Sequence, residues 1–303
     1  HAAQDFREDP VGYQITAEEL VVRIRNRVAD REGSVWDATE VLSRVDQSLE
    51  QIWTEVRLAG RDPELDSIDV AVSSIPDLGN KTYVYEPPPF MAHIRSIEGF
   101  GSSSAIPQEI QQVELYARDI SRLVAGGYAT WHRGPQGNVR FVGNLGRFTT
   151  ARIYFLRRWP PMHYGVAEAA GTDTTLEFDS TPSGRVLRQA DVYTGHRLQF
   201  LAGANADLIV RITGYDRVTN VVTFTPAVTA VADGDAYSLL VPLDAEHCDM
   251  VAIDATMSLL ASGGNDDYMA TLAPLQAMAR DRFRSSLSAR DQDSPRTVWS
   301  NDR

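Results

Sequence analysis

The sequence predicts an α+β protein: a helical bundle formed by N- and C-terminal helices, with extended strands and an inserted small all-β domain, sandwich-like or barrel-like. Apolar residues recur at helical spacing near both ends of the chain. Residues 172–242 instead contain only short strand-like runs, separated by Gly, Asn or Asp. Because each amphipathic helix needs a partner for its apolar stripe, we expect the helices of both termini to pack in one bundle.

Two helices are predicted near the N-terminus. Thr16 and Glu19 have the spacing of a capping box, which indicates a helix over 17–30. Asp37 and Glu40 give a second start signal, followed by a helix over 38–59 that Gly60 ends. Its apolar stripe follows a spacing of three and four residues and consists of Leu42, Val45, Leu49, Ile52 and Val56.

Strand-like segments dominate from 61 to 165, with one weaker helical pattern over 107–123. The prolines of EPPPF (86–90) require an extended chain, because proline disfavours the α-helix and has no N–H to donate to a neighbouring strand. The segments with strand character are IDVAVSSI, KTYVYE, FMAHIRSI, GPQGNVRFVGN and TTARIYFLRRWPPMHYG.

The stretch ITGYDRVTNVVTFTPA (212–227) predicts a β-hairpin inside the inserted domain. Tyr215–Asn220 would form the turn region, and Ile212, Val222 and Phe224 would enter the core. Strands recur about every ten residues here, as in a small sandwich or barrel.

Helical spacing returns at Asp244 and continues to about 262. A Gly-Gly-Asn turn (263–265) then precedes a last helix, and the final residues indicate an extended tail. The expected domains are a helical-bundle domain (11–171 with 243–288), an inserted β domain (172–242) and a C-terminal tail (289–303).

Composition excludes several classes of protein. The net charge is −12, from 29 basic and 41 acidic residues, which argues against a nucleic-acid binder with a basic face. It is compatible with a protein that lets DNA slide past, since an acidic lumen repels phosphate. No apolar run approaches the roughly 20 residues of a membrane span. The single cysteine, Cys248, excludes an internal disulfide and is expected to be a buried, inert thiol.

The residue patterns predict no catalytic, cofactor-binding or metal site, and therefore no enzyme. The six histidines form no HxH or HExxH pair, and no GxSxG motif occurs. The glycine-rich stretch 99–104 lacks the features of a phosphate loop. Asp233 and Asp235 could ligate calcium, although a tight turn accounts for them as well.

The C-terminal segment from Arg280 to Arg303 carries six arginines and four aspartates. Arginine and aromatic residues are the side chains that typically anchor protein interfaces. A solvated, frayed tail is the alternative interpretation. The candidates for interface contacts are Arg282, Phe283, Arg284, Arg290, Arg296, Val298 and Trp299.

The order of these elements resembles that of head–tail adaptor (connector) proteins of tailed bacteriophages, over about 1–170 and 243–303. The phrases that carry the resemblance are EELVVRIRNRVADREGSVWDATEVLSRVDQSLEQIW, KTYVYEPPPFMAHIRSI and YFLRRWPPMHYG, followed by two C-terminal helices and a polar tail. The resemblance implies a virion protein without a catalytic site, in a ring of about twelve copies beneath the portal. It also implies that the C-terminal segments contact the portal protein and that double-stranded DNA passes through the lumen.

Residues 172–242 resemble a short β unit that recurs in phage structural proteins, and many adaptors lack it. The first functional hypothesis is therefore a portal-to-tail adaptor, assembled in the bacterial cytoplasm and located at the head–tail interface. Its partners would be further copies of itself, the portal protein, and a tail or stopper protein or fibres. The alternative is a fibre- or receptor-associated protein whose β module recognises a surface ligand through Tyr193, Tyr215 and Arg217, with Phe224 and Tyr237 as further aromatic candidates. A third hypothesis, an acidic hydrolase, has little support.

Overall fold

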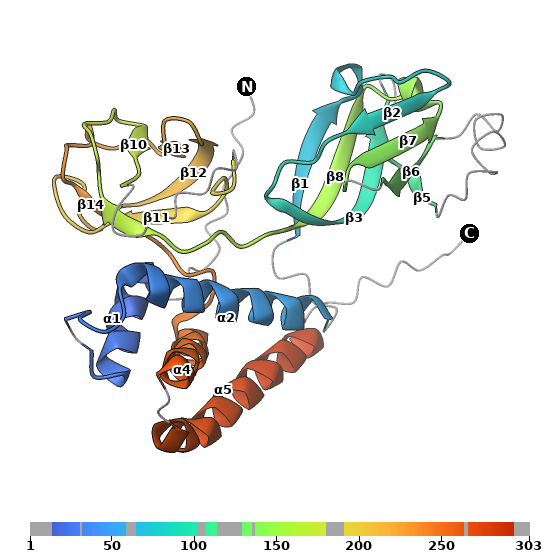
Figure 1. The fold of residues 1–303 in the computed structure, drawn as a ribbon. Helices are drawn as coiled ribbons and strands as arrows, with labels where there is room; N and C mark the ends of the chain where they lie inside the picture. The colour runs from blue at the N-terminus through green and yellow to red at the C-terminus, as the bar shows by residue number, and fades with distance from the viewer. Residues whose placement is uncertain are drawn as a thin grey trace. The chain divides into compact units, whose positions relative to one another are not determined.

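The computed structural model describes residues 14–30, 32–58, 65–101, 107–113, 129–134, 137–179, 191–263 and 266–293. The protein is mostly β (Figure 1): the described part contains sheets of four, four and six strands and four α-helices. The predicted fold class, a helical bundle with a small β module, is therefore wrong. The chain divides into two compact units, residues 62–158 and residues 1–61 with 159–303. The predicted division into domains remains a prediction.

The physical reason for the error is that the β segments build cores of their own. Two of the three hydrophobic clusters are formed by strands and the loops beside them, and only the third is mainly helical. Strand-like segments that were expected to extend from a bundle instead pair with one another and enclose their own apolar side chains.

The unit of residues 62–158 contains two four-stranded sheets, in the orders β1-β8-β3-β4 and β2-β7-β6-β5. Both sheets contribute to one core, around the buried side chains of Trp131, Phe141 and Phe155. The strands are β1 (Leu65–Ala71), β2 (Thr82–Tyr85), β3 (Met91–Phe100), β4 (Gln108–Glu109), β5 (Gln111–Gln112), β6 (Ala129–Arg133), β7 (Val139–Gly143) and β8 (Thr150–Arg157), with short 3-10 helices at Val72–Ser74 and Leu145–Arg147.

The helix predicted for 107–123 is absent over 107–113. There, β4 pairs with β3 and β5 runs parallel to β6, while 114–123 lie outside the described residues. Between the two short strands, Ile110 is buried. A single apolar residue flanked by polar ones fits the period of a helix and that of a strand, so the sequence pattern does not distinguish a helix from a strand here.

The six-stranded sheet is a half-barrel with the strand order β10-β13-β12-β11-β14-β9. Its predicted hairpin is confirmed: β12 and β13 pair antiparallel, and Ile212, Val222 and Phe224 are buried. In the turn, the Asp216 carboxylate accepts hydrogen bonds from the Val218 N–H at 2.8 Å and the Thr219 hydroxyl at 2.9 Å. The strands are β9 (Tyr164–Val166), β10 (Thr175–Glu177), β11 (Arg197–Phe200), β12 (Ile209–Asp216), β13 (Val221–Thr225) and β14 (Ala236–Leu239).

Aromatic rings fill the core of the half-barrel. Phe178 stacks on Tyr237 with ring centroids 5.0 Å apart and meets Tyr193 edge-on at 5.2 Å. The Tyr237 hydroxyl accepts from the Asp179 N–H at 2.7 Å and lies 3.0 Å from His163 Nε2, so the polar end of this buried tyrosine has partners.

The four helices are α1 (Ala17–Arg27), α2 (Ala38–Leu58), α4 (Ala245–Ser262) and α5 (Asp266–Asp293). The predicted capping box is confirmed, since Thr16 and Glu19 exchange hydrogen bonds of 3.1 Å. The Asp37 carboxylate accepts from the Glu40 N–H at 2.7 Å at the start of α2. In the part of the chain that the structure describes, no helix is both long and apolar enough to cross a membrane.

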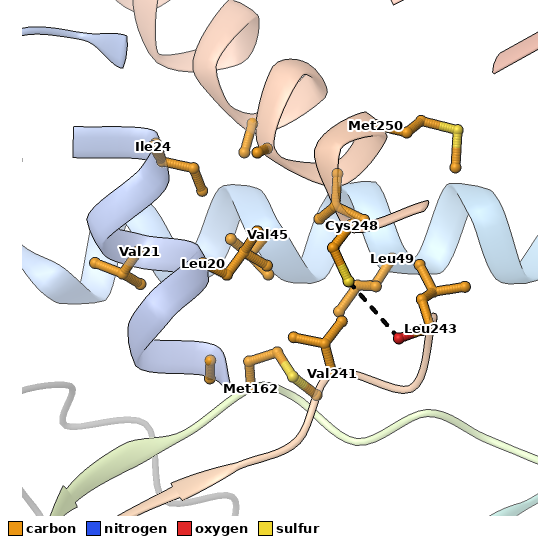
Figure 2. Close-up of a cluster of buried hydrophobic side chains, with 14 of the residues drawn as sticks. Leu20, Val21, Ile24, Val45, Leu49, Met162, Val241, Leu243, Cys248 and Met250 are labelled. Atoms are coloured by element: carbon orange, nitrogen blue, oxygen red, sulfur yellow. Dashed lines mark hydrogen bonds between the residues drawn. The ribbon is translucent and has the colours of Figure 1, made fainter. Parts of the chain in front are cut away.

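Helices from both ends of the chain share one hydrophobic cluster, part of which is shown in Figure 2. Leu20 of α1, Leu49 of α2 and Cys248 of α4 all contribute to it. Cys248 is buried, as predicted, and its thiol lies 3.7 Å from the Leu243 carbonyl. Burial raises the pKa of this thiol to about 12, which makes it a poor nucleophile.

The loop between α1 and α2 is organised by the Asp30 carboxylate. It accepts hydrogen bonds from the N–H groups of Trp36 (2.9 Å), Ser34 (2.8 Å) and Val35 (3.2 Å), and from the Ser34 hydroxyl (3.0 Å). The Trp36 bond is the largest cause that holds the Asp30 pKa below its ordinary value of 3.8. The ionised carboxylate therefore fixes the approach to α2.

Asp30 should make stability depend on pH. A carboxylate whose pKa is lowered by folding stabilises the protein above its ordinary value of 3.8, and the contribution disappears as pH falls through the folded pKa. Asp30→Asn should therefore be destabilised relative to the wild type most at neutral pH, and the difference should shrink as pH falls below 3.8. Urea denaturation across pH measures this. The exposed Asp249→Asn is the control, and a difference that stays constant with pH would contradict the role of Asp30.

Phe178→Ala should destabilise the half-barrel by about 3–5 kcal/mol, because it removes the ring that contacts Tyr237 and Tyr193 and leaves a cavity. Hydrogen exchange of β10–β14 measures the effect locally. Val218→Ala, at an 82% exposed position, should change stability by less than about 0.5 kcal/mol. Equal effects of the two changes would show that the ring cluster is not the core.

Candidate interaction surface

Helix α4 is apolar around nearly its whole circumference and is therefore covered on several sides. It contacts α1, α2 and α5. A helix with apolar residues all round is stable in water only when other elements cover it. Its buried residues are Cys248, Met250, Val251, Ala252, Ile253, Asp254, Ala255, Thr256, Leu259 and Leu260.

One acidic residue, Asp254, lies within this buried stretch, and its side chain is only 7% exposed. Its carboxylate accepts hydrogen bonds from Gln276 Nε2 at 2.6 Å and Arg280 Nη2 at 2.9 Å, both on α5. The Ser48 hydroxyl of α2 lies 3.4 Å from the same carboxylate. Asp254 thus joins α4 to the helices that cover it, and a buried charge requires such partners.

Glu55 of α2 extends this polar contact to a second arginine. Its carboxylate oxygens lie 3.3 Å from Arg280 Nη1 and 3.4 Å from Arg284 Nη2. Arg280 therefore bridges Asp254 and Glu55, while the more exposed Arg284 contacts Glu55. We call Asp254, Glu55, Gln276 and Arg280 the α5 anchor.

Apolar contacts of α5 are few. Leu272 and Phe283 are its only buried apolar side chains among the described residues. Phe283 belongs to the mainly helical hydrophobic cluster, and Ala279 packs against that cluster at partial burial. Phe283 meets the His247 ring edge-on, with centroids 5.1 Å apart. The Ser286 hydroxyl lies 3.2 Å from His247 Nε2. The helix is thus held by a narrow face that combines polar anchors with a small apolar contact.

Among the described residues, one group of possible metal ligands comes together: Asp244, Glu246 and His247, with ligand atoms within 4.8 Å of one another. His247 Nε2 is also engaged with Ser286, and Glu246 is largely exposed. The contacts of His247 with Ser286 and Phe283 account for its position as a link between α4 and α5. At the other suggested ligand pair, Asp235 accepts from the Ala232 N–H at 2.9 Å within a turn.

The outer side of α5 is unusually apolar for an exposed surface. Tyr268, Leu275 and Met278 are 44%, 46% and 53% exposed, respectively. Between Tyr268 and Met278 the remaining exposed positions are mostly alanine and proline: Ala270, Thr271, Ala273, Pro274 and Ala277. We call the exposed residues 268–278 the apolar face of α5. Contiguous exposed apolar surface of this kind is typical of interaction sites.

The predicted interface candidates fall in four groups. Arg282 and Arg284 are exposed on α5, just after the apolar face. Phe283 is only 3% exposed and belongs to the core. Arg290 lies in the last turns of α5, which continues to Asp293 into the segment expected to be extended. The candidates beyond the described residues are Arg296, Val298 and Trp299.

In the half-barrel, the candidate tyrosines are buried rather than exposed. Tyr193 and Tyr215 are 1% and 4% exposed and pack edge-on with centroids 5.0 Å apart. Burial raises the pKa of Tyr215 to about 12. Phe224 and Tyr237 are buried as well, while Arg217 is exposed in the β12–β13 turn. Aromatic recognition of a ligand by this cluster therefore gains no support.

The α5 anchor was missed at the level of sequence, although a signal for Asp254 was present. It is the one charged residue in the apolar run VAIDATMSLL, and such a residue is buried only with a partner. The partners Gln276 and Arg280 lie four residues apart, hence on one helix face. Nothing in the pattern connected the two helices.

Removing the central carboxylate should loosen α5. Asp254→Ala leaves Arg280 and Gln276 without their main acceptor and should cost roughly 2–4 kcal/mol, since breaking a buried pair from one side is strongly destabilising. Amide hydrogen exchange should become faster in α5, while exchange in the half-barrel should change less. Asp249→Ala is the matched control on the same helix: its side chain is 55% exposed and pairs with Arg23 and Arg27 at the surface, so its effect should stay below about 1 kcal/mol. Unchanged exchange in α5 of the Asp254 variant would contradict the anchor.

Comparison with known protein families finds none whose pattern matches this chain, and comparison with curated protein sequences finds no relative. The candidate surface therefore rests on the geometry and chemistry of its own residues.

Proposed function

We propose that this protein is a structural adaptor of a tailed-phage virion, which joins the portal to the tail in a ring of about twelve copies. The observation that carries the proposal is the apolar face of α5, an exposed stretch of a long helix with few charged side chains. A protein that works by assembly needs such surfaces, because burial of apolar area drives most protein association.

The charges that follow the apolar face fit contact with a partner. Arg282 is exposed on α5, and Arg284 is exposed apart from its contact with Glu55. Arginine beside apolar side chains is a common composition of interface anchors. In the proposed adaptor, this part of α5 and the residues after it contact the portal protein.

The β parts of the chain have cores of their own and supply surfaces for further contacts. Residues 62–158 have their own core, and the half-barrel has another. Each can present loops without disturbing the helices. In the proposed adaptor, one of them contacts the tail or stopper protein, or fibres. The net charge of −12 suits a lumen through which double-stranded DNA passes without binding.

Deleting residues 289–303 should leave a folded chain that no longer binds the portal. Met278→Asp, at a 53% exposed position, should weaken the same binding at least about tenfold, because it places a charge in the contact. Mass photometry of the chain mixed with the portal of the same virion measures ring-sized complexes.

Val218→Asp, in an 82% exposed turn of the half-barrel, is the control and should leave portal binding unchanged. Portal binding that survives both the deletion and Met278→Asp would overturn the assignment of this surface. No ring-sized complex of the wild type at any salt concentration would overturn the adaptor function itself.

A further inference from the structure

The apolar face of α5 lies between two exposed side chains of opposite charge. Asp267 is exposed at its N-terminal end and Arg282 is exposed at its C-terminal end. The two positions are 15 residues apart in the sequence, or about 22 Å along the helix. The midpoint between the two positions falls between Pro274 and Leu275, within the apolar face.

These residues share one side of the helix. Asp267, Thr271, Leu275, Met278 and Arg282 follow one another at spacings of four, four, three and four residues. Residues at such spacings form a continuous stripe on an α-helix. All five are exposed. The stripe therefore presents acid, apolar centre and base in order along one exposed surface.

Such a stripe is complementary to itself when a second copy lies antiparallel. With the two-fold axis at the midpoint, Asp267 of each copy faces Arg282 of the other. Thr271 then lies opposite Met278, and the two Leu275 side chains meet near the axis. We infer that two copies of this chain pair antiparallel through the exposed stripe of α5, from Asp267 to Arg282.

The pairing leaves the α5 anchor intact, because the anchor uses a different side of the helix. Gln276 and Arg280 face Asp254, Phe283 belongs to the hydrophobic cluster, and Leu272 is buried. A single helix pair buries less than the roughly 1,600 Å² of a standard protein interface. The dimer is therefore weak and depends on protein concentration. The pairing goes beyond the adaptor function and does not require it.

Charge reversal tests the pairing directly. Arg282→Asp and Asp267→Arg each place like charges opposite one another twice in the dimer, and each should weaken dimerisation about tenfold at low salt. The double variant D267R/R282D restores opposite charges and should recover dimerisation to within a few-fold of the wild type. Sedimentation velocity over a concentration series measures the dissociation constant, and circular dichroism checks that the helices persist.

Arg211→Asp, at an exposed position of β12, is the control and should dimerise like the wild type. A wild type that remains monomeric at all concentrations would overturn the pairing, as would a double variant no stronger than the single ones. Portal binding is measured in a separate experiment, so a chain that does not dimerise could still bind the portal as an adaptor.

Crosslinking tests the two-fold axis. Leu275→Cys should crosslink to its own copy with a short bis-maleimide, since helix axes in contact lie about 8–10 Å apart. The native Cys248 is buried, so background labelling is low. Arg211→Cys should give no crosslinked dimer. A larger oligomer in which Leu275→Cys does not crosslink would contradict antiparallel pairing while leaving assembly through other surfaces intact.

Discussion

The burial of α4 is the constraint on which the larger unit depends. Its apolar residues occur on all sides, so no single neighbour can cover it. The first helices of the chain cover it from one direction and α5 covers it from another. Helices separated by more than 180 residues of sequence therefore meet at α4.

Within that apolar surface, Asp254 determines where α5 lies. A buried carboxylate is tolerated only with charged or hydrogen-bonding partners, and α5 supplies two of them. Apolar contacts alone would allow α5 to shift along α4, because the two buried apolar side chains of α5, Leu272 and Phe283, are far apart in the helix. The fixed geometry of the Arg280 guanidinium between Asp254 and Glu55 gives the helix one register.

Local signals in the sequence were sufficient for the helix starts and for the β12–β13 hairpin. Thr16 with Glu19 and the pattern around Ile212 depend on residues close together in the chain. The amount of β structure is harder to predict, because many strands pair with partners that are distant in sequence. For example, β1 pairs with β8, and β9 pairs with β14. A periodic pattern shows which face of a segment is buried but does not identify the segment that covers it. For the same reason, Phe283 and Tyr193 looked like surface anchors but lie in cores.

The two sides of α5 have different consequences for assembly. The inner side is held by ionic hydrogen bonds, which require a specific geometry, whereas the outer side offers apolar area that many partners could cover. A dimer that uses the stripe from Asp267 to Arg282 covers Met278 and Arg282, which the proposed portal contact also needs. The two contacts therefore exclude each other on one copy. A weak dimer would cover the apolar face of α5 when no other partner is present. A partner that binds this face more tightly than the second copy does would displace that copy, because the two compete for the same surface.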